Sequence, residues 1–251
     1  MRTDQLAVQL YTVRESLEAD LPKTLRRVAE TGVESVELAG LPPIAPDDLR
    51  DQLAKAGLRP IASHESLERL QSNPDAVIAR LQMLGIRRAI VPWLAPEHRS
   101  SAEAARQTAR QLRRIAEYFD VRGMRLGYHN HDFEFEPLDG TTLWDILVEE
   151  LPASVELEVD LYWASIAGHD PVELIRSIGG RVRLLHMKDM APTTGREDLA
   201  PGDGVLDWPS IVTVATELGI EWYVIEQDNP TNPFVDITRA RGFLLGLVDR
   251  D

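Results

Sequence analysis

The fold is decided by residues 155–190, VELEVDLYWASIAGHDPVELIRSIGGRVRLLHMKDM. One apolar run ends in Asp160, a helix begins at Asp170-Pro171, and a second run ends in His186. This order predicts a strand, a helix and a second strand. In a parallel sheet such a unit returns the chain to the edge where it started, so both strands end on one face. We therefore expect Asp160 and His186 to be neighbours in space.

The same unit recurs along the rest of the chain as an amphipathic helix, a glycine, an apolar residue and a short strand. The glycine stands where a helix ends in left-handed geometry, which glycine adopts without strain. These positions are Gly32, Gly57, Gly85, Gly123 and Gly219. The pattern predicts eight strands, at about 5–11, 33–38, 58–63, 87–92, 124–130, 154–160, 181–187 and 221–226, and a last helix at about 234–248.

Eight strands alternating with helices are typical of an α/β fold of the (β/α)8 TIM-barrel type. The alternative is a doubly wound open sheet, which shows the same alternation. The first connection, YTVRESLEADLP, lacks the G-x-G-x-x-G of a dinucleotide fold, so we favour the barrel. Nothing in the sequence resembles a linker, and we expect residues 1–251 to form a single TIM-barrel domain.

Composition and charge exclude several classes of function. The chain has no cysteine, which excludes disulfides, thiolate metal sites and cysteine nucleophiles. Its net charge of -14 disfavours binding to nucleic acid. Neither a signal peptide nor an apolar run of the ~20 residues that span a membrane is apparent, so we expect a cytoplasmic protein without membrane contact. The sequence leaves open whether the chain forms homo-oligomers.

Chemically active side chains gather where the predicted strands end, which is where TIM barrels place their sites. Four of the six histidines stand there, and the other two, His98 and His169, fall in loops on the same face. His169 either touches a substrate or caps the following helix, and we favour the cap. The strand ends carry Gln9, Tyr11, Glu37, His64, Glu65, Trp93, His129, Asn130, His131, Glu134, Asp160, His186, Lys188, Asp189, Glu226 and Asp228.

Carboxylates and imidazoles without thiolates suit one divalent ion, with Mn²⁺ the first choice and Zn²⁺, Co²⁺ or Mg²⁺ as alternatives. Three carboxylates and one imidazole leave a negative site that suits a hard ion which keeps water or substrate oxygens. For Asp160 and Glu226, helix capping is the alternative role. The proposed ligands are Glu134, Asp160, His186 and Glu226.

Further side chains are candidates for catalysis and for substrate binding. Lys188 lies two residues after His186 and therefore faces the same side of an extended strand, where it could hold a substrate oxygen or pair with Asp189 or Asp160. The catalytic candidates are Glu134, Glu226, His131 and Lys188. The substrate-binding candidates are His64, His129, Trp93, Trp163 and Tyr11.

Five motifs resemble the sugar phosphate isomerase/epimerase superfamily of xylose-isomerase-like TIM barrels, over essentially the whole chain. They are LGYHNHDFEF (126–135), LEVDLYWASIAGHDP (157–171), LLHMKDM (184–190), GDGVLDW (202–208) and VIEQD (224–228). The superfamily includes inosose isomerases and dehydratases, ketose epimerases and a branch of apurinic endonucleases. The resemblance implies one metal, often Mn²⁺, held by Glu, Asp, His and Glu from strands five to eight.

Asp160, His186 and Glu226 match the last three ligands of that set. The remaining ligand of the set is the glutamate from strand five. In the epimerases this glutamate ends the strand, where this chain has His129, and the nearest carboxylate downstream is Glu134. Either residue could therefore be the strand-five ligand. Trp163 replaces a helper histidine that the epimerases carry.

These observations lead to three functional hypotheses. The first is a metal-dependent isomerase or epimerase acting on a small keto or aldo sugar or a cyclitol through a metal-stabilised enediolate. The second is a lyase of the inosose dehydratase or 3-keto-glycoside eliminase type. The third is a sugar-binding barrel without catalytic activity. In each case the partner is a small carbohydrate, and no phosphate-binding glycine loop follows the last two strands.

Overall fold

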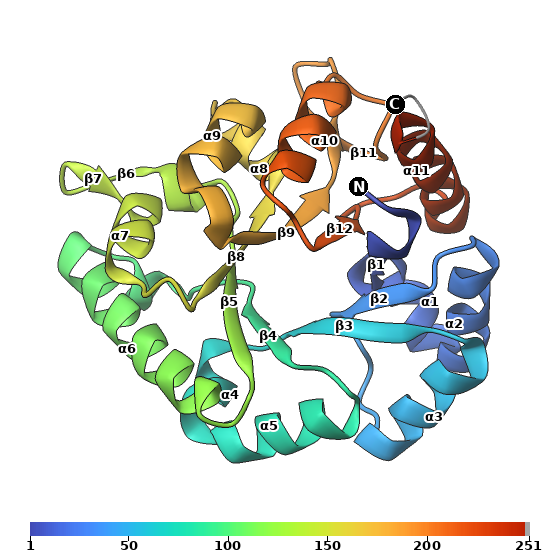
Figure 1. Cartoon of the computed structure of the whole chain (residues 1–251), viewed down its shortest axis with the longest axis horizontal. Coiled ribbons are helices and arrows are strands. Elements are labelled where there is room, and N and C mark those ends of the chain that lie inside the picture. The colour runs from blue at the N-terminus through green and yellow to red at the C-terminus, as the bar shows by residue number, and fades with distance from the viewer. Residues whose placement is uncertain (249–251) are drawn as a thin grey trace.

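Eight parallel strands close into a barrel in the computed structural model, which describes residues 1–248 (Figure 1). The predicted TIM barrel is therefore confirmed, and residues 249–251 of the predicted domain lie outside the described range. The barrel order is β1-β12-β9-β8-β5-β4-β3-β2. The barrel strands are β1 (Leu6–Gln9), β2 (Ser35–Leu38), β3 (Arg59–His64), β4 (Arg88–Val91), β5 (Arg125–His129), β8 (Glu156–Asp160), β9 (Val182–Met187) and β12 (Trp222–Ile225).

Helices surround the barrel on its outside (Figure 1). At least one α-helix follows each barrel strand, as the sequence pattern predicts, and two follow β1, β3 and β8. They are α1 (Arg14–Ala19), α2 (Leu21–Glu30), α3 (Pro46–Ala56), α4 (Leu67–Ser72), α5 (Pro74–Met83), α6 (Ala102–Asp120), α7 (Leu143–Glu150), α8 (Leu161–Ile166), α9 (Pro171–Ile178), α10 (Trp208–Glu217) and α11 (Pro233–Val248). Short 3-10 helices are η1 (Thr3–Gln5), η2 (Leu10–Val13), η3 (Pro96–His98), η4 (Phe133–Phe135) and η5 (Gly179–Arg181).

Local sequence signals explain where the helices begin and end. The side chains of Asp20, Asn73 and Asp207 accept hydrogen bonds from backbone N–H groups in the first turns of α2, α5 and α10. Such caps satisfy donors that have no partner within the helix. All five glycines predicted at helix ends have a positive φ, for example 72° at Gly57 after α3.

The hydrophobic core has two parts, and the smaller part lies directly beneath a layer of polar side chains. The larger core packs the outer faces of the strands against the helices. A small apolar cluster fills the inside of the barrel and consists of Ala7, Ile61, Ala62, Ile90, Leu184 and Val224. Because side chains alternate along a strand, the next inward position after Ala7, Leu184 or Val224 is Gln9, His186 or Glu226. Polar side chains therefore form the layer above the apolar cluster.

Two details differ from the sequence-based expectation. The first strand ends at Gln9, and Tyr11 lies in η2, because the neighbouring strands β2 and β12 offer no pairing partner beyond Leu38 and Ile225. Two small antiparallel hairpins were not predicted: β6 (Pro137–Leu138) with β7 (Thr141–Thr142), and β10 (Asp189–Met190) with β11 (Asp198–Leu199). No helix within residues 1–248 is long and apolar enough to cross a membrane.

Candidate functional site

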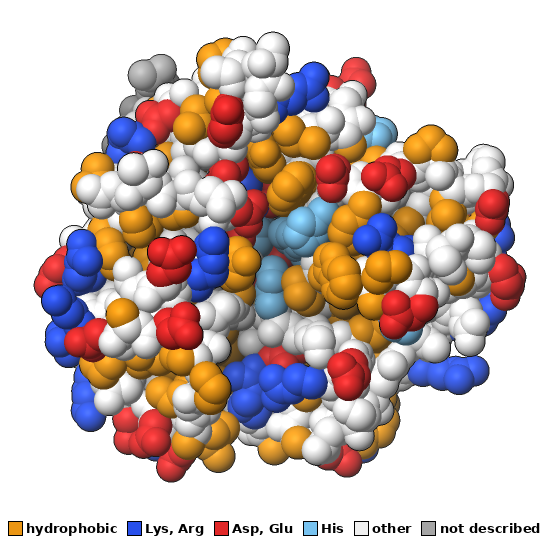
Figure 2. Space-filling model, turned by 180° about the vertical axis from the view of Figure 1, so that it is seen from behind, with side chains coloured by type: hydrophobic (Ala, Val, Ile, Leu, Met, Phe, Trp, Pro, Cys, Tyr) orange, Lys and Arg blue, Asp and Glu red, His pale blue; other side chains and the backbone are white. Residues whose placement is uncertain are grey.

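The site lies at the carboxyl ends of the barrel strands, on the face shown in Figure 2. A hollow in the middle of this face has histidine side chains at its base, carboxylates beside them and hydrophobic side chains around much of its rim. The hollow corresponds to a cavity of about 300 Å³. Its lining residues are Gln9, Tyr11, Ala39, Gly40, His64, Pro92, Trp93, His129, His131, Glu226 and Asp228.

Three metal-capable side chains meet at this mouth, and we call Asp160, His186 and Glu226 the mouth group. Asp160 ends β8 and pairs in register with His186 on β9, while Glu226 directly follows β12. His186 Nδ1 lies 2.8 Å from Glu226 Oε2 and 3.9 Å from Asp160 Oδ2. The strand order alone brings these three side chains together, as the sequence analysis expected for Asp160 and His186.

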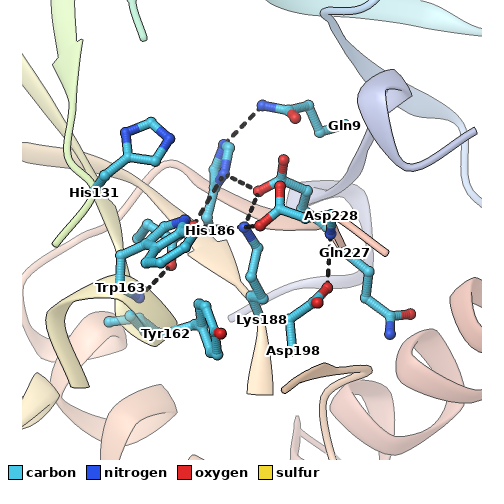
Figure 3. Close-up of polar contacts among 12 residues, drawn as sticks. Gln9, His131, Tyr162, Trp163, His186, Lys188, Asp198, Gln227 and Asp228 are labelled. Atoms are coloured by element: carbon cyan, nitrogen blue, oxygen red, sulfur yellow. Dashed lines mark hydrogen bonds and ion pairs between the residues drawn. The ribbon is translucent and has the colours of Figure 1, made fainter. Parts of the chain in front are cut away.

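Lys188 is buried beside the mouth group (Figure 3). Its Nζ donates a hydrogen bond of 2.8 Å to Asp228 Oδ2 and lies 2.9 Å from Glu226 Oε2 and 3.1 Å from Asp160 Oδ2. It pairs with Asp160 but not with Asp189, whose carboxylate accepts hydrogen bonds from the loop at 202–208 instead. The ammonium thus supplies positive charge where three carboxylates converge.

This arrangement shifts the pKa values of the groups around Lys188. Burial alone would raise the pKa of Glu226, but Lys188 and then His186 hold it well below its usual value. Burial raises the pKa of Asp160 to about 6, although Lys188 opposes the shift. Burial would lower the pKa of Lys188, but Asp160 and Glu226 raise it well above normal. Lys188 therefore keeps its proton throughout the neutral range.

The two carboxylate oxygens of Asp160 show how the mouth group could hold a divalent cation. Its Oδ1 caps α8 by accepting a 3.0 Å hydrogen bond from the N–H of Trp163, so the capping alternative also holds for this residue. Its Oδ2 is buried and makes no hydrogen bond. The Lys188 ammonium, 3.1 Å away, compensates this oxygen, and a divalent ion in the mouth group would be a second cation within its reach. Two carboxylates and one imidazole are a donor set that suits Mn²⁺, Co²⁺ or Zn²⁺.

A second set of polar side chains lies one layer deeper in the barrel. His64, His129 and Glu158 form a second metal-capable group together with His186. Glu37 lies next to it, with Oε2 at 2.9 Å from His186 Nε2. His64 and His129, expected to bind substrate, thus belong to this deeper set and also line the cavity. The sequence analysis missed Glu158, although its position two residues before Asp160 places it on the same side of β8.

Glu134 is not brought together with the other three predicted ligands. Its carboxylate accepts hydrogen bonds from Tyr128 Oη at 2.6 Å and from the His131 N–H at 2.7 Å. It belongs to neither metal-capable group and does not line the cavity. The geometry gives no support to Glu134 as ligand or catalyst, because η4 turns it away behind His131. Burial raises its pKa to about 7.

His131 reaches the cavity and has a free ring nitrogen. Burial and then the charge of Lys188 lower its pKa to about 4, which leaves the imidazole neutral at neutral pH. Its buried Nδ1 makes no hydrogen bond. Asn130 fixes the loop beneath it by accepting a hydrogen bond from the Asp160 N–H and donating one to the Asp160 carbonyl oxygen.

Three aromatic residues predicted to bind substrate surround this end of the barrel. Tyr11 and Trp93 line the cavity and are partly exposed. The ring of Trp163 lies 5.6 Å from that of His131, and Lys188 Nζ lies 5.6 Å from the Trp163 ring centre. The expected cap at His169 is wrong: Asp170 caps α9, and the His169 ring packs on Phe135.

Comparison with known proteins identifies the family to which the chain belongs. A family model described as "Xylose isomerase-like TIM barrel" matches residues 25–244. The chain belongs to this family. A search of curated proteins gave no match.

Solved structures of similar fold agree with the xylose isomerase-like assignment. A structure titled sugar phosphate isomerase/epimerase from Parabacteroides distasonis has a TM-score of 0.85 at 23% identity, covering 99% of this chain and 96% of that one. One titled L-ribulose 3-epimerase has a TM-score of 0.73 at 17% identity, covering 97% and 94%. A probable 3-DHS dehydratase from Bacillus anthracis has a TM-score of 0.74 at 12% identity, covering 96% and 98%. At these identities the likeness shows the fold alone.

Proposed function

We propose that this xylose isomerase-like protein is a divalent-metal-dependent isomerase or epimerase that acts on a small polyhydroxylated keto or aldo sugar or cyclitol. The observation that carries the proposal is the mouth group of Asp160, His186 and Glu226, whose donor atoms converge beside the cavity that Glu226 and the neutral His131 line. A bound divalent ion would supply Lewis acidity, which makes the C–H bond between a carbonyl and a hydroxyl group easier to deprotonate.

His131 is the side chain best suited to accept that proton. Its Nδ1 is free, its imidazole is neutral, and it lines the cavity. By contrast, Glu226 Oε2 already lies within 3 Å of both His186 and Lys188. A positioned imidazole can take a proton from one carbon of the substrate and return it to the neighbouring carbon or to the opposite face.

Lys188 and the aromatic residues complete the site. The Lys188 ammonium contacts Glu226 and Asp228, which line the cavity, and so adds positive charge behind substrate oxygens on which negative charge develops during the reaction. Tyr11 and Trp93 offer flat apolar surfaces to a sugar ring and reduce the access of water. The described residues that line the cavity include no lysine or arginine, which favours a substrate without a phosphate group.

The proposal is tested by incubating the purified protein with a panel of keto sugars in heavy water. We expect Mn²⁺-loaded protein to introduce deuterium beside the carbonyl group and to form an isomer of unchanged skeleton, followed by NMR. Chelated protein and Asp160→Asn should do neither, while His131→Gln should lose turnover but still bind the ion. His98→Gln, which removes a histidine outside both metal-capable groups, is the control. Full activity of Asp160→Asn in chelator would contradict the proposal.

A lyase is the second candidate, and the position of Lys188 favours it. Elimination of a hydroxyl or alkoxyl group requires a donor near the departing oxygen, and the buried ammonium is such a donor. The heavy-water experiment separates the two reactions. Elimination yields an unsaturated or cleaved product, whereas isomerisation keeps the molecular formula apart from exchanged hydrogen.

A further inference from the structure

The deeper polar layer of the barrel forms a compact donor set of its own. Three imidazole nitrogens from three strands converge on one oxygen, Glu158 Oε2. His64 Nε2 lies 2.8 Å from it, His186 Nε2 3.1 Å and His129 Nδ1 3.2 Å. Donors bound to one zinc ion at about 2.0–2.1 Å lie about 3–3.5 Å apart, so this spacing is already close to that of a coordination shell.

Two carboxylate oxygens of this layer are buried without a hydrogen bond. They are Glu158 Oε1 and Glu37 Oε1, and both residues are fully buried. Unsatisfied acceptors at this depth are rare in folded proteins. They point to a cation that the layer can hold.

Only imidazoles supply positive charge to this layer. Within residues 1–248, the only ion-pair partners of Glu37 and Glu158 are the histidines of the layer, and no lysine or arginine reaches them. Burial would lower the pKa of both imidazoles, but Glu37 and Glu158 raise that of His64 to about 10, and Glu158 and Glu226 raise that of His186 well above its usual value. Without an ion, two protonated imidazoles therefore balance the two buried carboxylates. A single divalent ion would match both negative charges.

His186 connects the deeper layer to the mouth group. Its Nδ1 faces Glu226, while its Nε2 faces Glu37 and Glu158. Glu158 and Asp160 are two residues apart on one strand, so the two layers are about 6.6 Å apart along it. The cavity touches both His64 and His129, which gives an ion a path to the deeper layer.

We propose that a second divalent cation binds among His64, His129, Glu158 and His186, with Glu37 beside it. Three imidazoles favour a borderline ion such as Zn²⁺ or Co²⁺, whereas the carboxylate-rich mouth group favours Mn²⁺. With both positions filled, His186 would offer Nδ1 to the mouth group and Nε2 to the deeper layer, and its two ring protons would pass to solvent. This inference does not rest on the reaction proposed above.

Metal stoichiometry tests the proposal. The full chain is stripped with a chelator, reloaded with Zn²⁺, freed of unbound ion by gel filtration and measured by elemental mass spectrometry. We expect two equivalents of zinc per chain in the wild type and in the control His98→Gln. Glu158→Gln, His64→Gln and Asp160→Asn should each retain one equivalent, and the double variant Glu158→Gln/Asp160→Asn should retain none.

The alternative is that the deeper layer only orients His186 through hydrogen bonds. In that case the wild type binds one equivalent, which Asp160→Asn loses and Glu158→Gln keeps, and the second site is wrong while the proposed function stands. A wild type that binds no zinc also overturns the second site. Should Glu158→Gln fail to fold, His64→Gln decides the matter, because His64 is partly exposed and two equivalents in this variant would refute the site.

Discussion

Lys188 places a full positive charge among three carboxylates at the base of the mouth. Its ammonium stands 3.1 Å or less from Asp160, Glu226 and Asp228 and is almost completely buried. Removing one partner of a buried ion pair is costly because the other charge stays behind without compensation. Lys188 is therefore a stabilising group of the metal-free protein as well as a catalytic candidate.

Lys188→Met should destabilise the metal-free protein by about 3–5 kcal/mol, the usual cost of leaving a buried charge unpaired. Saturating Mn²⁺ should restore much of this loss, because the ion replaces the missing positive charge between Asp160 and Glu226. Urea unfolding with and without Mn²⁺ measures both effects. Lys55→Met, at an exposed site on α3, is the control. An equal loss in both conditions would argue against a cation position at the mouth.

The raised pKa of Glu134 predicts how the stability of the protein depends on pH. Burial raises its folded-state pKa to about 7 from the usual 4.5, so between these pH values the folded protein holds a proton that the unfolded chain has already released. Its contribution to stability is complete below pH 4.5 and is lost as the pH rises to about 7. The difference in unfolding free energy between wild type and Glu134→Gln should therefore change by about 3 kcal/mol over this range.

Urea unfolding at several pH values measures this dependence on Glu134. Glu136→Gln, at the exposed position two residues later, should follow the wild type at every pH. If Glu134→Gln also follows the wild type, Glu134 is ionised in the folded protein and the burial argument is wrong.

The sequence predicts the positions of some site residues better than those of others. Asp160, His186 and Lys188 are found because each stands at the end of a recognisable strand, and strand ends share one face. Glu134 lies apart from the other three proposed ligands, because it stands in the short η4 helix and its oxygens bond to Tyr128 and His131, and a motif carries no information on that turn. Glu158 was not predicted because a charged residue inside an apolar strand is usually expected to point outward. Its spacing of two residues from Asp160 shows that it points to the same side of the strand as Asp160.

At the scale of elements, Asp189 anchors the loop that follows β9. Its carboxylate accepts hydrogen bonds from the backbone N–H groups of Met190, Gly202, Gly204 and Leu206, and from the Trp208 indole N–H at 2.6 Å. One side chain thereby fixes the β10–β11 hairpin relative to the start of α10.

Asp189→Ala should destabilise the protein by about 3 kcal/mol, because it leaves the buried Trp208 indole N–H and several part-buried backbone N–H groups without an acceptor. The matched control is Asp207→Ala, which removes an exposed cap of α10 and should cost only about 1 kcal/mol. Thermal or urea unfolding compares the two variants. Equal costs would show that Asp189 does not hold the loop.

The elements themselves were largely predictable. Helix caps and glycines at helix ends mark the connections, and all eight barrel strands lie within one or two residues of their expected ranges. The two hairpins could not be predicted, because strands of two residues are too short to show a hydrophobic period. Their pairing depends on tertiary contacts such as those of Asp189.

At the scale of the whole molecule, a resident ion links the strands of the mouth group and should stabilise the entire barrel. An ion at 100 times its dissociation constant adds about 2.7 kcal/mol to the free energy of unfolding. We therefore expect Mn²⁺ to raise the melting temperature of stripped wild-type protein. Asp160→Asn should show a much smaller shift, measured by calorimetry with Ca²⁺ as a control ion. Identical shifts in wild type and variant would place the stabilising ion elsewhere.

The most direct test of the mouth group is anomalous diffraction from crystals of the Mn²⁺-loaded protein. We predict a manganese peak bounded by Asp160 Oδ2, His186 Nδ1 and the Glu226 carboxylate, with the Lys188 ammonium displaced toward Asp228. A fully loaded crystal without a peak there, with Lys188 still between Asp160 and Glu226, would contradict the account.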